Sequence, residues 1–135
     1  EPEMCGNGIR CMAQFVAALE GREGTQFSTT IHTLAGKIIP EVLADGQVRV
    51  DMGPPTLDGP SVPTTLPCNG DGVAVKAPLT INGTDYEVTC VSMGNPHAVV
   101  FVDDLEALPF ETVGPLFECD PVFPKKINAE FVQVL

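Results

Sequence analysis

The chain has 135 residues, of which 44% are apolar and 19% charged, so it has enough apolar side chains for a core and is not wholly disordered. Its net charge of −11 argues against nucleic-acid and anionic-membrane partners, because both need clustered Lys and Arg. No apolar run reaches the roughly 18 residues of a transmembrane helix, and no basic-then-apolar segment opens the chain. We therefore expect a cytoplasmic protein without a membrane partner.

The first part of the chain predicts one helix and three strands. Five apolar residues recur at three- and four-residue steps and predict a helix over 8–20, with Gly21 at the place of a left-handed cap. These residues are Ile9, Met12, Phe15, Val16 and Leu19. Strands are then predicted over 27–34, 37–43 and 47–52, joined by tight turns at Ala35-Gly36 and Asp45-Gly46.

Residues 54–67 are rich in proline and predict a crossing segment between two packed units. After it, 77–81 and 84–93 predict a hairpin around Asn82-Gly83, and 98–102 predicts an apolar strand. The segment 105–118 contains two prolines, so we expect at most short helical turns there. Residues 131–135 begin another strand. Because the chain starts without Met and stops inside a predicted strand, we expect a fragment of a longer protein.

Five cysteines occur, at positions 5, 11, 68, 90 and 119, and an odd number cannot form a complete set of disulfides within one chain. No pair has CxxC spacing, so neither a zinc ribbon nor a thioredoxin-like motif is indicated, and we expect no metal site. We expect reduced thiols, most of them buried as small apolar residues. Cys5 is the expected exception.

The segment MCGNGIRC, residues 4–11, places Cys5 and two glycines at the start of the predicted helix. The first N–H groups of a helix lack internal partners, and they carry the positive end of the helix dipole. Both features favour a thiolate at Cys5, and the same N–H groups, unobstructed at Gly6 and Gly8, can receive a carboxylate or phosphate. A tight turn with a small buried cysteine would show the same residues, so spacing alone leaves both interpretations open.

A second polar cluster, Ser92-Met93-Gly94-Asn95-Pro96-His97, lies between two predicted strands, where active-site loops are common. The His97 imidazole could tune a nearby thiol or carboxylate. Alternatively, Asn95-Pro96 is an ordinary turn and His97 a satisfied loop residue. Asn128 fits either a strand entry or a ligand contact.

Together these segments resemble diaminopimelate epimerase. The resemblance rests on MCGNGIRC, on SMGNPH (92–97) and on FPKKINAEF (123–131), with further similarity at 50–53 and 112–115. The related proline racemases and hydroxyproline epimerases have His after the Cys-Gly pair, whereas this chain has Asn7.

The resemblance implies epimerisation of LL-diaminopimelate to meso-diaminopimelate in lysine biosynthesis, without pyridoxal phosphate or any other cofactor. Two cysteines act from opposite faces of the substrate, one as thiolate base and one as thiol acid. Cys5 matches one of them, and His97 matches a residue thought to adjust the cysteines. Gly6, Asn7, Asn95 and Asn128 match substrate contacts.

The resemblance also implies an α/β fold of the α+β kind, with two similar domains of curved, mostly antiparallel sheet around a central helix. Residues 1–53 would be the end of the first domain, 54–67 the crossing segment and 68–135 the first part of the second domain. Both domains would be incomplete, so pairing through exposed strand edges, or a homodimer, is expected.

The family's second cysteine lies in an Ala-Cys-Gly-Thr-Gly segment that does not occur here. We therefore expect the chain alone to be inactive. Two alternatives remain open: a sister isomerase of the same fold that acts on another amino or hydroxy acid, and a non-catalytic truncated fragment.

Overall fold

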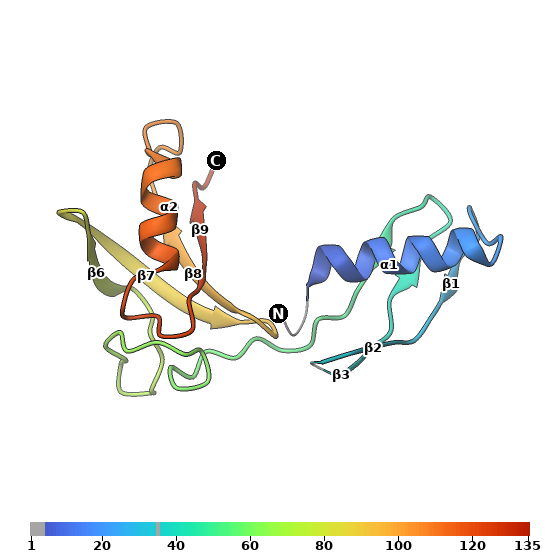
Figure 1. The fold of residues 1–135 in the computed structure, drawn as a ribbon, viewed down its shortest axis with the longest axis horizontal. Coiled ribbons are helices and arrows are strands. Elements are labelled where there is room, and N and C mark those ends of the chain that lie inside the picture. Colours follow the sequence, from blue (N-terminus) through green and yellow to red (C-terminus); the bar gives the residue numbers. More distant parts are fainter. Residues whose placement is uncertain (1–4, 35) are drawn as a thin grey trace. The chain divides into compact units, whose positions relative to one another are not determined.

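A computed structural model describes residues 5–34 and 36–135 (Figure 1). Met4 of the first motif and Ala35 of the first predicted turn lie outside the described residues. The chain divides into two compact units, Glu1–Pro54 and Pro55–Leu135, and each is described by itself. Two helices and mainly antiparallel sheets make up the described part, which confirms the α+β class.

In its described residues, the first unit contains one helix and five short strands. The helix begins at Gly6, two residues before the predicted start. Its C-terminal end confirms the prediction, because Gly21 has a left-handed φ of +64° and the Arg22 N–H donates to the Ala17 carbonyl at 2.9 Å. One sheet has the order β1-β4-β5, and β2 pairs with β3 in a separate hairpin. The elements are α1 (Gly6–Leu19), β1 (Phe27–Ser28), β2 (Ile31–Thr33), β3 (Gly36–Ile38), β4 (Glu41–Val42) and β5 (Val48–Arg49).

The first two predicted strands are each broken in two, although the hairpin keeps one register. Ser28 pairs with Glu41 and Ile31 with Ile38, which are positions of the same antiparallel ladder. Between them lies Pro40, which has no N–H to donate to the ladder. Only its carbonyl contributes, by accepting from the Thr29 N–H at 3.3 Å. The proline therefore separates β3 from β4.

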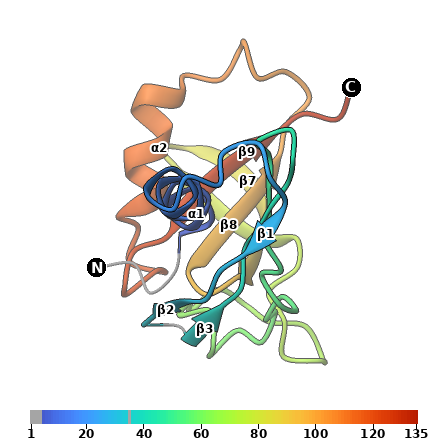
Figure 2. The same cartoon turned by 90° about the vertical axis from the view of Figure 1, so that its right-hand side faces the viewer.

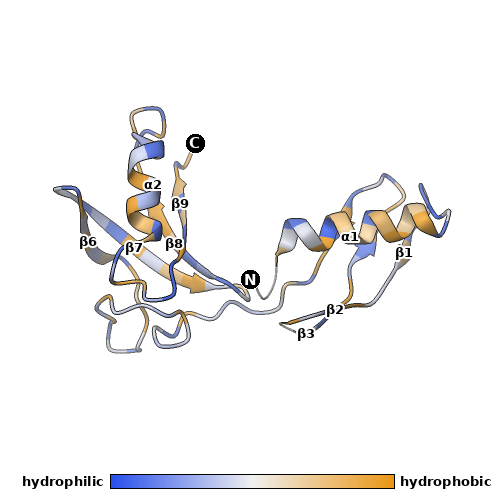
Figure 3. Ribbon diagram, viewed as in Figure 1, coloured by the Kyte–Doolittle hydropathy of each residue, from blue (hydrophilic) through white to orange (hydrophobic). Residues whose placement is uncertain are grey.

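Helix α1 packs against β4 and β5 through a stripe of mostly small residues, and it is apolar along most of its length (Figure 3). Ile9, Ala13 and Ala17, at steps of four, are buried. Of the predicted apolar stripe, Met12, Phe15 and Leu19 are exposed. The periodicity thus predicted the helix, but not which of its faces is buried in this unit.

The second unit is a four-stranded sheet with α2 (Phe110–Glu118) on one face, as both views show (Figures 1 and 2). Its strand order is β6-β7-β8-β9, with antiparallel pairs except for the parallel pair β8–β9. The turn at Asn82-Gly83 has φ of +49° and +80°, as a type I′ hairpin requires, and confirms the prediction. The strands are β6 (Ala77–Ile81), β7 (Thr84–Ser92), β8 (Pro96–Phe101) and β9 (Asn128–Val132).

The expectation of only short helical turns over 105–118 is wrong, since α2 has nine residues with Pro115 inside it. Proline removes one helical hydrogen bond, but α2 buries Val113 and Phe117 in the core of the unit. The Phe117 ring meets Tyr86 and Phe131 edge-to-face, with centroids 5.1 and 5.2 Å away. Packing of the apolar face therefore outweighs the proline.

Candidate functional site

Cys5 occupies the N-cap position of α1. Its backbone is extended, with φ −137° and ψ 112°, and its Sγ accepts a hydrogen bond from the Gly8 N–H at 3.4 Å. Its carbonyl accepts the first bond of the helix, from the Ile9 N–H at 2.9 Å. The side chain is exposed. The sulfur is thus held against the helix N-terminus while remaining open to solvent.

The N-terminus of α1 keeps its positive character. Its first turn contains no acidic side chain, and the N–H groups of Gly6 and Asn7 have no acceptor within the helix. The Asn7 side-chain oxygen accepts a hydrogen bond from the Arg10 guanidinium, which leaves the Asn7 amide N–H groups to donate elsewhere. This end of the helix therefore offers several donors to an anion beside the sulfur.

Gly6 and Gly8 are not required by the backbone, because neither has a positive φ. A Cβ on Gly6 would lie 3.8 Å from Cε of Met52, and a Cβ on Gly8 would lie 3.6 Å from Sγ of Cys5. Both are ordinary contact distances. The fold would therefore accept a larger residue at position 8. The effect of glycine there is to leave the Cys5 sulfur uncovered.

A second group of predicted residues gathers at one edge of the second unit's sheet. Strands β8 and β9 are parallel, so their N-terminal ends lie side by side, and His97 pairs with Asn128. Asn95 lies in the tight turn between β7 and β8, directly before β8. The Asn128 side-chain amide donates to the Pro96 carbonyl at 2.9 Å. The fold therefore brings Asn95, His97 and Asn128 together.

Both ring nitrogens of His97 have side-chain partners. Nδ1 lies 2.6 Å from Oε1 of Glu130, and Nε2 lies 2.9 Å from Oδ1 of Asn95. Sequence reasoning gave no role to Glu130. The last strand was predicted to begin at residue 131, whereas β9 begins at Asn128, and only this earlier start puts Glu130 on the same face as Asn128.

The expectation that most cysteines are buried is wrong, since four of the five are exposed. Cys11 lies on an open side of α1, and Cys119 is the C-terminal cap of α2. Only Cys90, in the core of the second unit, is buried, and burial raises the pKa of its thiol to about 11. Exposure alone does not distinguish Cys5; its N-cap position does.

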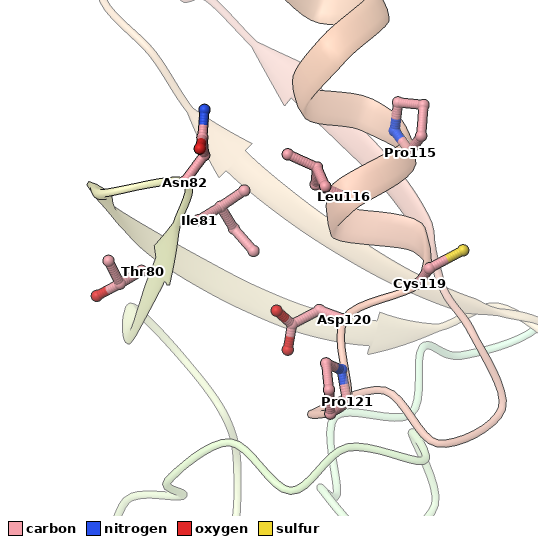
Figure 4. Close-up of a pocket in the computed structure, with 8 residues that line it drawn as sticks. All are labelled: Thr80, Ile81, Asn82, Pro115, Leu116, Cys119, Asp120 and Pro121. Atoms are coloured by element: carbon pink, nitrogen blue, oxygen red, sulfur yellow. The ribbon is translucent and has the colours of Figure 1, made fainter.

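A hollow of about 290 Å³ lies between the β6–β7 turn and the C-terminal end of α2 (Figure 4). Its lining includes Asn82, Leu116, Cys119 and Asp120. None of the predicted site residues lines it, so the hollow and the predicted chemistry are in different places. The predicted residues instead form two separate groups, each within its own unit: one at the N-terminus of α1 and one at the β8–β9 edge.

Comparison with known proteins shows which family the chain matches. The family model described as "Diaminopimelate epimerase" matches residues 1–57 and 89–135, which is most of the chain. The chain belongs to the diaminopimelate epimerase family. This confirms the resemblance drawn from the three motifs.

Curated relatives in this family are similar along the whole chain. Proteins named diaminopimelate epimerase from Acaryochloris marina and Microcystis aeruginosa are 59% and 57% identical over 136 and 135 residues, covering 100% of this chain and 48% of each relative. The chloroplastic diaminopimelate epimerase of Oryza sativa subsp. japonica is 51% identical over 144 residues, covering 40% of that protein. The chain therefore spans about half the length of the curated relatives it matches. Among the described residues, no helix is both long and apolar enough to cross a membrane.

Proposed function

We propose that the full-length protein epimerises LL-diaminopimelate to meso-diaminopimelate in lysine biosynthesis, by acid–base catalysis with two cysteines and no cofactor. The observation that carries the proposal is the position of Cys5 at the N-cap of α1 in a chain of this family. We place this reaction in the cytoplasm.

Cys5 would act as one of the two proton-transfer groups. A thiolate is favoured where backbone N–H groups and the helix dipole meet the sulfur, and the Gly8 N–H already donates to Sγ. Removal and return of an α-proton is general acid–base catalysis, and a cysteine side chain can take part in it. The open side of Sγ leaves room for the substrate carbon.

Negative charge develops on the substrate carboxylate when the α-proton leaves. The backbone N–H groups of Gly6 and Asn7, which have no acceptor within α1, are donors that can take up this charge. Asn7 adds side-chain donors, because its oxygen is already engaged by Arg10. These donors would stabilise the deprotonated substrate, which is the role that a cofactor such as pyridoxal phosphate has as an electron sink.

The remaining contacts would come from the β8–β9 edge. Asn95 lies directly before β8 and Asn128 begins β9. Their side-chain amides can bind the carboxylate and ammonium groups of a diamino diacid. His97 would hold the Asn95 side chain in place and adjust the acid–base behaviour of the two cysteines. We further propose that residues 1–53 and 68–135 are parts of the two domains of the family fold.

The second cysteine is not among the residues of this chain, so the 135-residue chain alone should not epimerise the substrate. The test is solvent deuterium incorporation at the α-carbons of diaminopimelate, measured for the full-length protein and for residues 1–135. Exchange by the full-length protein alone supports the proposal. Exchange of another amino or hydroxy acid in its place favours the sister isomerase, and exchange by the short chain contradicts the two-cysteine mechanism.

A further inference from the structure

Three side chains of the second unit form a continuous hydrogen-bonded row, Glu130–His97–Asn95. The Glu130 carboxylate meets Nδ1 of His97 at 2.6 Å, and Nε2 meets the Asn95 amide oxygen at 2.9 Å. The imidazole side chain is 24% exposed and that of Glu130 is 39% exposed. The His97–Glu130 contact is thus partly sheltered from water, where a charge-assisted hydrogen bond is stronger than at the surface.

The parallel pairing of β8 with β9 produces this contact. His97 is registered with Asn128, and Val99 with Glu130, so Glu130 lies diagonally across from His97 on the same face of the sheet. The opposite face, with Ala98 and Val100, is in the core. A regular sheet therefore holds the carboxylate against the imidazole, and no flexible loop intervenes.

Glu130 is not explained by the packing of the unit. Its second oxygen, Oε2, is buried and has no hydrogen-bond partner among the residues that the structure describes. A buried carboxylate oxygen without a donor costs free energy. The contact that Glu130 does make is the one with His97.

A carboxylate only accepts hydrogen bonds, so Nδ1 must carry a proton in this contact. The nitrogen that carries the proton in a neutral imidazole is set by the hydrogen bond that holds the ring. We propose that Glu130 is a positioning residue of the site in the proposed function: it keeps the proton on Nδ1 of His97, so that Nε2 is the nitrogen that orients the Asn95 amide toward the substrate.

The orientation of Asn95 follows from Nε2, which lies 2.9 Å from the Asn95 side-chain amide. An amide can donate from its NH₂ group or accept through its oxygen, so whether Nε2 carries a proton decides which of the two faces the ring and which faces the substrate. By keeping the proton of the neutral ring on Nδ1, Glu130 fixes one of these two orientations of Asn95.

The decisive readout is the protonation of the two His97 ring nitrogens in the full-length protein, followed by ¹⁵N NMR across a pH series. The signals are assigned with His97→Gln, and the exposed His32 of the first unit serves as an internal reference. We expect Nδ1 to stay protonated in the neutral ring of the parent. In Glu130→Ala the neutral ring should move to the Nε2–H form, and Glu130→Gln, whose oxygen can still accept, should restore Nδ1–H in part. A parent ring with bare Nδ1, or no change in Glu130→Ala, would overturn the proposal.

Kinetics give a second readout. Loss of Asn95 orientation should raise KM for diaminopimelate by about tenfold in Glu130→Ala, while the alkylation rate of Cys5 stays at the parent value. Glu106→Ala, at an exposed position, is the matched control and should change neither. An unchanged KM in Glu130→Ala would contradict the inference. If the parent itself exchanges no α-proton, the proposed function fails, and the NMR result still decides the role of Glu130.

Discussion

Gly8→Ala should separate the stability of helix α1 from the reactivity of the Cys5 thiol. Gly8 is the third residue of α1, and its N–H donates to Cys5 Sγ at 3.4 Å. An added methyl group would lie 3.5 Å from Cβ and 3.6 Å from Sγ of Cys5. These are van der Waals contacts without overlap, so the fold should accept the substitution.

The expected effects on stability and reactivity have opposite signs. Alanine is favoured over glycine within a helix by up to about 1 kcal/mol, so the free energy of unfolding should stay level or rise by about 0.5–1 kcal/mol. The same methyl group would cover part of the sulfur where the donors point. Because displacements of about 1 Å at a reacting centre can cost a hundredfold in rate, we expect α-proton exchange to fall by about ten- to a hundredfold.

The assay combines urea unfolding, iodoacetamide labelling of Cys5 read by peptide mass spectrometry, and deuterium exchange into diaminopimelate, all on the full-length protein. Gly21→Ala, at the other end of α1, is the control. Its φ of +64° makes alanine unfavourable there, so it should lower stability by about 1 kcal/mol and leave Cys5 labelling unchanged. If Gly8→Ala labels and exchanges at the parent rate, or destabilises by more than Gly21→Ala, our account of the helix N-terminus is wrong.

Three further predictions follow from the same structure. Asn7→His in the full-length protein should raise KM for diaminopimelate while Cys5 still alkylates at the parent rate, since an imidazole places its donors differently; unchanged steady-state constants would rule out the role of Asn7. Because burial raises the pKa of Cys90 from 9.0 to about 11, its contribution to stability should be complete below pH 9 and be lost as the pH rises toward 11. Unfolding curves of the parent and Cys90→Ala should therefore differ less at pH 11 than at pH 8, and an equal difference would contradict the burial argument. Phe117→Ala, which removes the fully buried ring of α2, should cost about 3–5 kcal/mol in the free energy of unfolding, and a cost below about 1 kcal/mol would show that α2 does not anchor this core.

Local signals in the sequence were enough for the helix N-terminus and for the clearest hairpin. The apolar repeat from Ile9 placed Cys5 near the start of a helix, and Asn82-Gly83 predicted a tight hairpin turn, because each signal depends on neighbouring residues only. The same reasoning failed for α2. Its proline carries a local penalty, whereas the burial of Phe117 that outweighs this penalty depends on the whole unit.

Glu130 could not be recognised from the sequence for a related reason. Its contact with His97 spans 33 residues and exists only because β8 and β9 are parallel and in one particular register. Alternation of residues predicts the face of a strand but not its partner. The motifs located the candidate residues, and strand pairing then determined which of them touch.

The most direct test of the central claim, that Cys5 is a proton-transfer group, is Cys5→Ser in the full-length protein. Serine is a preferred N-cap, and its hydroxyl can accept from the Gly8 N–H as Sγ does, so α1 should be retained. An alcohol is far less acidic than a thiol and cannot serve as the base near pH 7. The account predicts that calorimetric binding of diaminopimelate persists while deuterium incorporation at the α-carbon is lost. Deuterium incorporation at the parent rate would show that another residue is the base.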